Sequence, residues 1–366
     1  ADHLHFTNTK TIRAGIGTPE EDKAGGGHAH CGTMVYLGDN WPAKYRGQVF
    51  MNNIHGRRVN MDVLARKGSG YTATHAPDVL RAADPWFVGV SLAYGPDGGV
   101  YVSDFSDTGE CHHTRNTRKH TGRIYKITYG KPEPWRGDIN KLKTAELAAL
   151  QLHDNDWFVR HARRVLYERL DYTRKIWSPA LSDPKKNHAA WRSFREGHFA
   201  AMDTVLKKQL AEHKSVPKRL RALWALYVTD GVEADDLIEL FKDRNEHVRA
   251  WAIQLLMNDF RMAKGGVALL TEMAENDKSP LVRLYLASAA QRVPVNLRAP
   301  LLKALLAHSE DVGDPNLPLM YWYATEPVVA ADPKIGVQLL AVCKLPKVRQ
   351  FITRRMATGR ETSEPE

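Results

Sequence analysis

The order of apolar and polar positions divides this chain into a first part with the period of strands and a second part with the period of helices. Over positions 1–140, short runs rich in Val, Ile, Tyr and Thr alternate with Gly, Pro, Asn and Asp. That alternation is typical of strands joined by tight turns, and Gly95–Gly99 is predicted to close a hairpin. The predicted strands are Gly32–Leu37, Gly47–Asn53, Arg58–Leu64, Val88–Tyr94, Gly99–Asp104 and Gly122–Tyr129.

Apolar positions recur every three or four residues from about residue 140 onward, which predicts helices beginning with Lys141–Leu150. The tryptophans of this part fall on the apolar faces of the predicted helices. We therefore expect their rings to lie in the core rather than to bind a ligand. They are Trp157, Trp191, Trp224, Trp251 and Trp322.

A weak repeat is visible in the helical part. The segments Asn155–Ala162, Asn245–Ala252 and Lys278–Tyr285 share a polar turn, then Val-Arg, then an apolar run. This is typical of HEAT repeats, in which the turn caps the second helix of each pair and the Arg pairs with an acid of the neighbouring repeat. The interval between the first two Val-Arg pairs is more than twice the interval between the last two, so one or two further repeats are expected between the first and the second.

Glycine content changes where the period changes, with 19 of the 26 glycines at positions 1–140. The sequence therefore predicts a mixed multidomain fold. It consists of all-β propeller blades over residues 1–135, an all-α HEAT-like solenoid over residues 140–358 and a disordered tail over residues 359–366. A propeller closes with about four to eight blades, whereas this segment supplies about two or three. We expect these to be the last blades of an incomplete propeller in a longer protein.

Charge and composition exclude several classes of protein. Lys and Arg total 52 against 42 Asp and Glu, a net charge of +10, but acids are interspersed among them, so specific nucleic-acid binding is not expected. No run of about 18 apolar residues occurs, so no transmembrane segment is expected. The three cysteines form no Cys-x-x-Cys pair, which excludes a zinc ribbon and an attached c-type haem but leaves one disulfide open. Cys343 is expected to lie in the core.

The first candidate site is the segment Gly25–Gly32, in which His28 and His30 precede Cys31. In an extended chain both imidazoles lie on the same side, and the glycines let a ligand or another backbone approach closely. This pattern suits contact with a metal or a cofactor. The alternative is a glycine-rich loop whose histidines are exposed or bonded to backbone carbonyls.

The second candidate site is the turn that contains His55, Arg57 and Arg58. Two guanidinium groups that follow a glycine at the edge of a strand could bind a carboxylate or phosphate in bidentate fashion. The same residues could equally form a solvated turn.

The third candidate site is an acidic segment at the end of a predicted strand. Asp104, Asp107 and Glu110 are a candidate calcium site, although their spacing differs from that of an EF-hand loop. The adjacent Cys111 and His112 could form a nucleophile pair, but no oxyanion-hole signature accompanies them, so hydrolysis is not expected.

Several of these segments together resemble a known family. They are Gly27–Pro42, Asn53–Asn60, Asp84–Phe87, Tyr94–Asp104, Asp107–Cys111, Gly122–Gly130 and Asp314–Tyr323. They resemble the membrane-bound dehydrogenase family of planctomycete and verrucomicrobial bacteria, also described as haem-binding Cys-x-x-Cys-His proteins. Members combine a six-bladed propeller similar to the glucose and sorbosone dehydrogenases with HEAT repeats and a C-terminal c-type haem domain.

The resemblance implies pyrroloquinoline quinone and calcium as cofactors, and a periplasmic or cell-envelope location. It places the two candidate sites formed by His28, His30, His55, Arg57 and Arg58 near the quinone. The catalytic base of the dehydrogenase relatives lies in an earlier blade, so the resemblance assigns no catalytic residue to this chain. Haem c is implied only in a downstream domain that is absent from this sequence.

Two functional hypotheses follow, and enzymatic activity remains open between them. In the first, the chain is a portion of a cell-envelope quinoprotein-type dehydrogenase that oxidises sugars or alcohols and passes electrons to a haem domain or cytochrome. In the second, it is a non-catalytic propeller and HEAT scaffold that binds glycan or protein partners through its HEAT surface. A third class, a cytoplasmic HEAT scaffold for nucleic acid or protein, would show DNA binding with a steep dependence on salt.

Overall fold

The computed structural model describes residues 18–27, 29–106, 120–177, 184–258 and 265–358, with side chains of the segment that starts at 184 described from 190 onward. The predicted tail, residues 359–366, lies outside these ranges. The chain forms two compact units. One contains residues 1–65 and 72–187, and the other contains residues 66–71 and 188–366.

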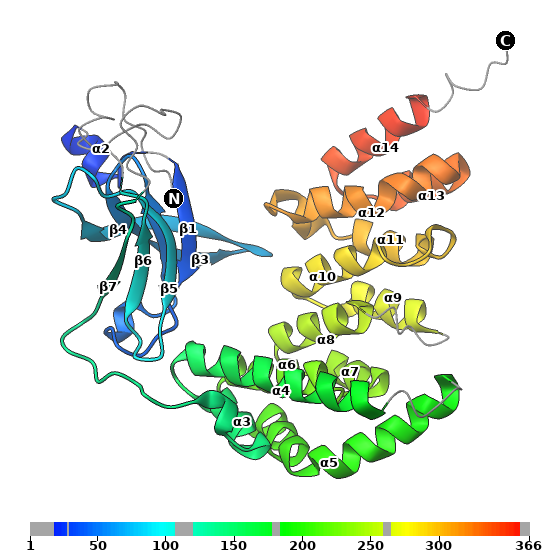
Figure 1. The fold of residues 1–366 in the computed structure, drawn as a ribbon. Coiled ribbons are helices and arrows are strands. Elements are labelled where there is room, and N and C mark those ends of the chain that lie inside the picture. The colour runs from blue at the N-terminus through cyan, green and yellow to red at the C-terminus, as the bar shows by residue number, and fades with distance from the viewer. Residues whose placement is uncertain (1–17, 28, 107–119, 178–183, 259–264, 359–366) are drawn as a thin grey trace. The chain divides into compact units, whose positions relative to one another are not determined.

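The N-terminal half folds into two antiparallel sheets (Figure 1). The first has the order β1-β2-β3-β4 and the second the order β5-β6-β7, so each is built from strands consecutive in sequence. The strands are β1 (His30–Val35), β2 (Val49–Asn53), β3 (Arg58–Lys67), β4 (Gly70–Arg81), β5 (Gly89–Tyr94), β6 (Val100–Asp104) and β7 (Arg123–Ile127). The prediction of antiparallel sheets followed by helices is confirmed.

All six predicted strands are present, but β4 was not expected from the sequence. This strand contains Pro77, which has no backbone N–H to donate and counts against a central strand. The structure resolves the conflict because β4 lies at the edge of its sheet, where an absent donor costs little. The predicted hairpin at Gly95–Gly99 is confirmed, with the Gly95 amide donating to the Gly99 carbonyl at 2.9 Å.

A shared apolar core joins the two sheets. Its buried members are Met34, Tyr36, Phe50, Val59, Met61, Phe87, Tyr94, Val100 and Val102. Where β1 approaches β5, Gly32 leaves no room for a side chain. A Cβ on Gly32 would lie 2.3 Å from the Val90 carbonyl oxygen and 2.7 Å from the Ser91 Cα. The close contact between the sheets therefore depends on glycine at this position.

The first helices belong to the same unit as the sheets. They are α2 (Pro19–Lys23), α3 (Thr144–Ala149) and α4 (Asp156–Trp177), with short 3-10 turns η1 (Ala43–Tyr45), η2 (Ile139–Lys141) and η3 (Leu150–Leu152). Asp156 at the start of α4 donates its amide to the Leu37 carbonyl at 3.0 Å and accepts the Tyr94 hydroxyl at 3.2 Å. Asn155 donates from Nδ2 to the Gly95 carbonyl at 3.0 Å. The turn before α4 is thus fixed to the segment that follows β1 and to the β5–β6 hairpin.

The second unit is a stack of helices in two layers (Figure 1). One layer contains α6 (Val216–Val228), α8 (Glu246–Asn258), α10 (Pro280–Ala290), α12 (Leu317–Ala331) and α14 (Pro346–Thr358). The other contains α9 (Gly266–Asn276), α11 (Ala299–Leu306) and α13 (Pro333–Val342). The remaining elements are α5 (Pro184–Glu212), α7 (Ala234–Glu239), η5 (Leu240–Lys242), η6 (Val295–Leu297) and η7 (Ser309–Gly313).

Polar side chains cap the helices that follow the three predicted repeat turns. The Oδ1 atoms of Asn155 and Asn245 each accept the backbone amide two residues ahead at 3.0 Å. The Ser279 hydroxyl accepts the Val282 amide at 3.3 Å. These bonds satisfy amides at helix N-termini that have no partner within the helix. The predicted capping of the repeat helices is therefore confirmed.

Arginines also link successive repeats, as predicted. Arg249 of α8 pairs with Asp277, and Arg283 of α10 pairs with Asp311. Arg219 of α6, which lies outside the Val-Arg pattern, makes the equivalent pair with Asp243. Arg160 differs, because its partner Asp156 lies one turn earlier in its own helix.

The expected burial of the tryptophans is only partly correct. Trp191 is buried at 5% exposure, as predicted. Trp157, Trp224, Trp251 and Trp322 are instead half-buried. Period alone placed them on the apolar face of each helix, but it could not show that this face is only partly covered by neighbouring helices. The prediction for Cys343 is confirmed, since its side chain is buried.

Candidate functional site

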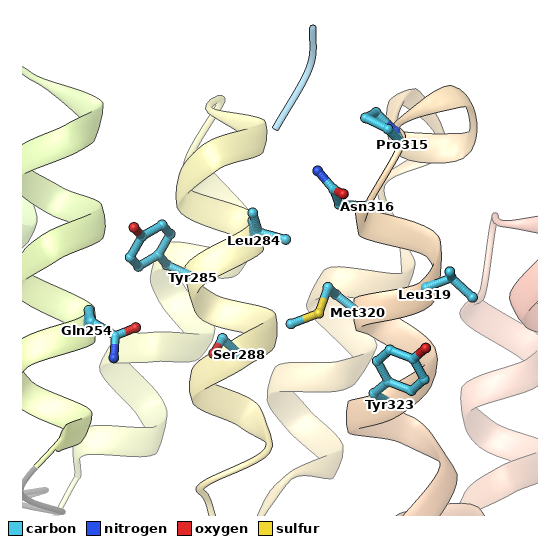
Figure 2. Close-up of a pocket in the computed structure, with 9 residues that line it drawn as sticks. All are labelled: Gln254, Leu284, Tyr285, Ser288, Pro315, Asn316, Leu319, Met320 and Tyr323. Atoms are coloured by element: carbon cyan, nitrogen blue, oxygen red, sulfur yellow. The ribbon is translucent and has the colours of Figure 1, made fainter. Parts of the chain in front are cut away.

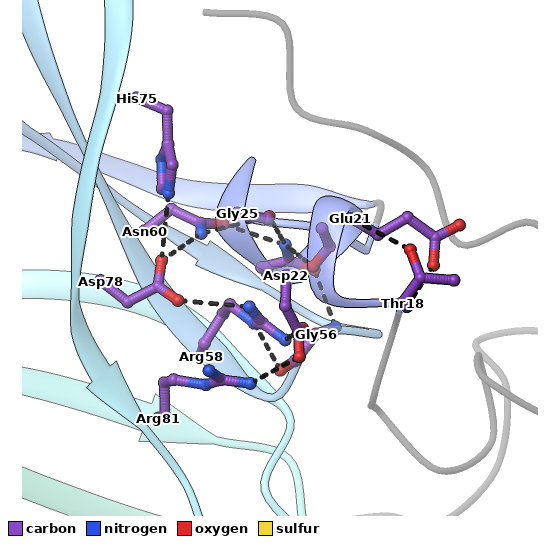
Figure 3. A network of polar contacts seen from close by, with 12 residues as sticks. Thr18, Glu21, Asp22, Gly25, Gly56, Arg58, Asn60, His75, Asp78 and Arg81 are labelled. Carbon is purple, nitrogen blue, oxygen red and sulfur yellow. Dashed lines mark hydrogen bonds and ion pairs between the residues drawn. The ribbon is translucent and has the colours of Figure 1, made fainter.

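A polar network lies where the glycine-rich segment after α2 meets β2 and β3 (Figure 3). Helix α2 begins with a capping box, in which Thr18 and Glu21 each accept the other's backbone amide. The chain then turns through Gly25, whose φ is +70°. A Cβ on Gly25 would lie 2.6 Å from the His75 ring and 2.8 Å from Asn60 Nδ2. Glycine is required here because the backbone itself packs against the network.

Two buried asparagines hold this backbone in place. Asn53 at the end of β2 donates from Nδ2 to the Gly25 and Gly26 carbonyls, both at 3.1 Å. Asn60 on β3 donates from Nδ2 to Asp78 Oδ1 at 2.7 Å and lies 3.3 Å from the Gly25 carbonyl. Both asparagines are fully buried. Because an unpaired amide in the core is costly, these bonds specify one position of the glycine-rich turn.

His30 is joined to the same pair of asparagines. Its Cα is paired with that of Asn53, and its Nε2 lies 3.2 Å from both Asn53 Nδ2 and Asn60 Oδ1. Asn53 Nδ2 has three nearer acceptors for its two hydrogens, namely the Gly25 and Gly26 carbonyls at 3.1 Å and Asn60 Oδ1 at 2.9 Å. We therefore assign the imidazole hydrogen to Nε2, which donates to Asn60. Nδ1 is then the basic nitrogen of His30, whose side chain is exposed.

Arg58 is fully buried and its guanidinium is engaged by groups of the protein itself. Nη2 lies 2.7 Å from Asp22 Oδ1, Nη1 lies 3.2 Å from Asp78 Oδ2, and Nε donates to the Gly56 carbonyl at 2.9 Å. Two carboxylates thus balance one buried cation. The geometry gives Arg58 a structural role, and the expected bidentate binding of a ligand would require these pairs to break.

Asp22 connects α2 to this cation. Burial raises the pKa of Asp22, but the hydrogen bond and charge of Arg58, together with those of Arg81, outweigh it and leave the pKa below its ordinary value. Arg81 Nη2 lies 3.0 Å from Asp22 Oδ2. The ionised carboxylate therefore fastens the end of α2 to β3 and β4.

His55 and Arg57 lie in the turn between β2 and β3, next to this network. His55 is buried at 5% exposure. Arg57 is half-buried and has a φ of +49°, an uncommon conformation for a residue with a side chain. Burial lowers the pKa of Arg57, and the nearby Asp84 opposes that effect. Of the two predicted arginines, Arg58 is the one that pairs with Asp22 and Asp78.

His75, which no sequence motif singled out, faces two carboxylates. His75 Nδ1 lies 3.7 Å from Asp62 Oδ1, and its Nε2 lies 3.8 Å from Asp78 Oδ1. All three side chains are largely buried. His75 and Asp78 lie on β4, the strand that the sequence did not predict, so no local signal placed them beside β3.

The acidic segment proposed for calcium is described only at Asp104. Its Oδ1 accepts the amides of Val88 at 2.7 Å and Ser106 at 2.9 Å, and its Oδ2 lies 2.7 Å from Arg123 Nε. The carboxylate therefore fixes the end of β6 to its neighbours. Asp107 and Glu110 lie outside the described residues, as do Cys111 and His112, so calcium binding here stays a prediction.

Metal-ligating groups are not concentrated elsewhere in the described chain. No cluster of three or more His, Cys, Asp or Glu side chains there is arranged to hold a metal ion. His28 lies outside the described residues. Cys31 and Cys343 are free thiols, and burial raises the pKa of each.

Comparison with known proteins identifies a domain in the N-terminal half. Residues 2–131 match a domain of unknown function, DUF7133. These residues include both sheets and the network of His30, Asn53, Asn60 and Arg58. No curated protein matches the chain. Among the described residues, no helix combines the length and the apolar character needed to cross a membrane.

Proposed function

We propose that this chain is a portion of a cell-envelope quinoprotein-type dehydrogenase that oxidises sugars or alcohols. The observation that carries the proposal is the orientation of His30 by Asn60. A hydrogen bond of 3.2 Å from Nε2 to the buried amide oxygen leaves Nδ1 as the basic nitrogen. A base held in one tautomer on a rigid strand is what proton removal from a hydroxyl group requires.

In this proposal His30 Nδ1 accepts the proton of the substrate hydroxyl group. The electron pair left on that oxygen forms the second bond of the product carbonyl, and the C–H bond of the same carbon breaks, its electron pair leaving with the hydrogen as hydride. Pyrroloquinoline quinone supplies the hydride acceptor when bound. Transfer of electrons onward to a haem domain or cytochrome is part of the same proposal and concerns groups beyond this chain.

The charged groups near His30 decide which residues would face the quinone carboxylates. Arg58 is paired with Asp22 and Asp78, so it adds no net positive charge for a ligand. Arg57 lies in the adjacent turn between β2 and β3, and its partly desolvated guanidinium suits pairing with a carboxylate. We therefore assign carboxylate binding to Arg57 and keep Arg58 as the structural cation. The proposed calcium remains with Asp104, Asp107 and Glu110.

The test is titration of this chain, and of the full-length product of its gene, with pyrroloquinoline quinone in the presence and absence of calcium. We expect saturable quenching of intrinsic fluorescence that Arg57→Ala weakens. His30→Gln should abolish sugar- or alcohol-dependent dye reduction by the full-length protein while leaving quinone binding intact. His120→Gln, an exposed histidine of the same unit, is the control. The absence of quinone binding in both proteins would exclude the dehydrogenase proposal.

A second candidate function is a non-catalytic scaffold that binds glycan or protein partners. It is favoured by the way Arg58, Asp22 and Asp78 neutralise one another. A network of this kind stabilises the glycine-rich turn without needing a ligand. A protein that binds partners with no affinity for quinone would support this alternative.

A further inference from the structure

The helical unit contains a cavity of about 480 Å³ between α8, α10 and α12 (Figure 2). Its volume is within the range of small-molecule sites, about 300–1,000 Å³. Tyr285 of α10 and Tyr323 of α12 line it together with the Met320 side chain. Amide and hydroxyl groups come from Gln254 and Ser288. The cavity therefore combines aromatic surface with uncharged hydrogen-bonding groups.

None of the residues that line this cavity is charged. The chain as a whole has a net charge of +10, so neutrality here is a local property. Burial raises the pKa of Tyr285, with a smaller contribution from Tyr71, so its hydroxyl stays a neutral donor. A nucleic acid or an acidic peptide would require cationic side chains at its binding site. The cavity instead suits a ligand without charge.

Aromatic rings continue from the cavity along the same layer of helices. Tyr285 lies 6.4 Å from the Trp251 ring, and Trp251 lies 4.8 Å from the Trp224 ring, measured between centroids. Trp224, Trp251 and Tyr285 are half-buried, and the Tyr323 side chain is 54% exposed. Each ring comes from a different helix. Together these four residues form an aromatic row.

The repeat accounts for two of the four rings, Trp251 and Tyr285. Trp251 and Tyr285 are separated by the same number of residues as the two Val-Arg pairs of α8 and α10. The same interval separates Gln254 from Ser288. Trp251 and Tyr285 therefore occupy equivalent positions of successive repeats, and so do Gln254 and Ser288. In both repeats the polar residue follows the aromatic residue by three positions, which places the two on the same face of the helix. Equivalent surfaces repeated at the spacing of helices match a ligand that is itself a chain of similar units.

We propose that the aromatic row and the adjoining cavity bind a neutral oligosaccharide. The C–H faces of sugar rings pack against aromatic rings, and their hydroxyl groups pair with amides and hydroxyls such as those of Gln254, Ser288 and Tyr323. Two of the lining amides already donate within the protein, Asn316 from Nδ2 to Ser69 Oγ at 3.2 Å and Gln254 from Nε2 to Asn258 Oδ1 at 2.9 Å, so only their carbonyl oxygens are assigned to the ligand. The site lies in the helical unit and is independent of the proposed quinone chemistry.

The experiment measures binding of the full chain to maltohexaose, cellohexaose, xylohexaose and a wider array of neutral glycans by calorimetry and array fluorescence. We expect at least one glycan to bind, and Trp251→Ala and Tyr323→Ala each to weaken it roughly tenfold. Tyr285→Phe keeps the ring and should change affinity by less than about threefold. Tyr172→Ala removes an exposed ring of the other unit and should have no effect.

Tyr323 keeps the test decisive if Trp251→Ala fails to fold, because its side chain is largely exposed. The proposal is overturned if no neutral glycan binds, or if binding is unaffected by Tyr323→Ala. It is also overturned if a proline-rich peptide, or a sulfated polysaccharide with steep salt dependence, binds at this site in place of neutral glycans. None of these results depends on quinone binding, so failure here is distinguishable from failure of the dehydrogenase proposal.

Discussion

Arg249 and Asp277 form a bidentate ion pair between two successive repeats, with Nε 2.7 Å from Oδ2 and Nη2 2.9 Å from Oδ1. The same arginine donates from Nη1 to the Asp243 carbonyl at 2.9 Å. Asp277 in turn accepts the Ser279 amide at 2.9 Å. One guanidinium therefore joins the turn before its own helix to the turn before the next helix of the layer.

Arg249→Ala should destabilise the helical unit by about 3 kcal/mol, because it leaves the largely buried Asp277 carboxylate without its counter-charge. Hydrogen exchange should report the loss as faster exchange at the start of α10. Arg192→Ala, which removes an exposed arginine from α5, is the control and should cost less than about 1 kcal/mol. Equal effects of the two substitutions would show that the pair does not connect the repeats.

Gly32→Ala should destabilise the sheet unit more than Gly47→Ala. Both glycines have positive φ, +56° and +83°, so both substitutions introduce backbone strain. A Cβ at Gly32 would also meet the Val90 carbonyl, whereas one at Gly47 would have nothing within 4 Å. We expect an additional cost of about 2 kcal/mol for Gly32→Ala from this overpacking, measured by chemical denaturation. Similar costs at the two positions would contradict the close approach of β1 and β5.

Acidification should weaken the ion pairs of Asp22 and so destabilise the turn after α2. The folded-state pKa of Asp22 lies below its ordinary value near 3.8, so the ionised carboxylate stabilises the folded state. That contribution is complete above the ordinary value and is lost as pH falls through the lowered folded-state pKa. The amides of Gly25 and Gly26 should therefore keep their exchange protection down to about pH 4 and lose it progressively below that pH, after correction for intrinsic rates. Asp22→Asn should remove this pH dependence, and protection that persists unchanged in acid would contradict the role of Asp22.

His30 should exist as a single tautomer with its hydrogen on Nε2. The physical reason is that Asn60 Oδ1 lies 3.2 Å from Nε2, whereas the hydrogens of Asn53 Nδ2 are directed elsewhere. Long-range nitrogen NMR of the imidazoles measures this population directly. Exposed His120 provides the reference for a freely exchanging ring. Asn60→Ala should move His30 toward that reference, and a hydrogen found on Nδ1 of wild-type His30 would refute the assignment.

Local sequence patterns were sufficient for most of the fold. The strands with clear alternation and the helices with capped repeat turns were all predicted, because turn residues and periodicity are properties of short segments. Strand β4 was missed because Pro77 counts against a strand unless its edge position is known. The partner of Arg249 was predicted only by type, and its identity as Asp277 depends on how the repeats stack.

The candidate site was less predictable than the fold. His30 and Arg58 were identified from residue type, but Asn53 and Asn60, which connect them, are unremarkable in sequence. Their roles depend on the register that sets His30 against Asn53 and Asn53 against Arg58. The half-buried state of Trp251 was likewise invisible to periodicity, which distinguishes the faces of a helix but not how far each face is covered.

The ion pairs of the helical unit have a consequence for how its length can vary. Asp243, Asp277 and Asp311 follow one another at equal intervals along the chain, and each carboxylate is bound by the arginine of the preceding repeat. If one complete repeat were removed or duplicated, an equivalent aspartate would lie at the same place. Every arginine would then still form its ion pair with the aspartate of the next repeat. The number of repeats can therefore change in whole steps during evolution or design without any new compensating substitution.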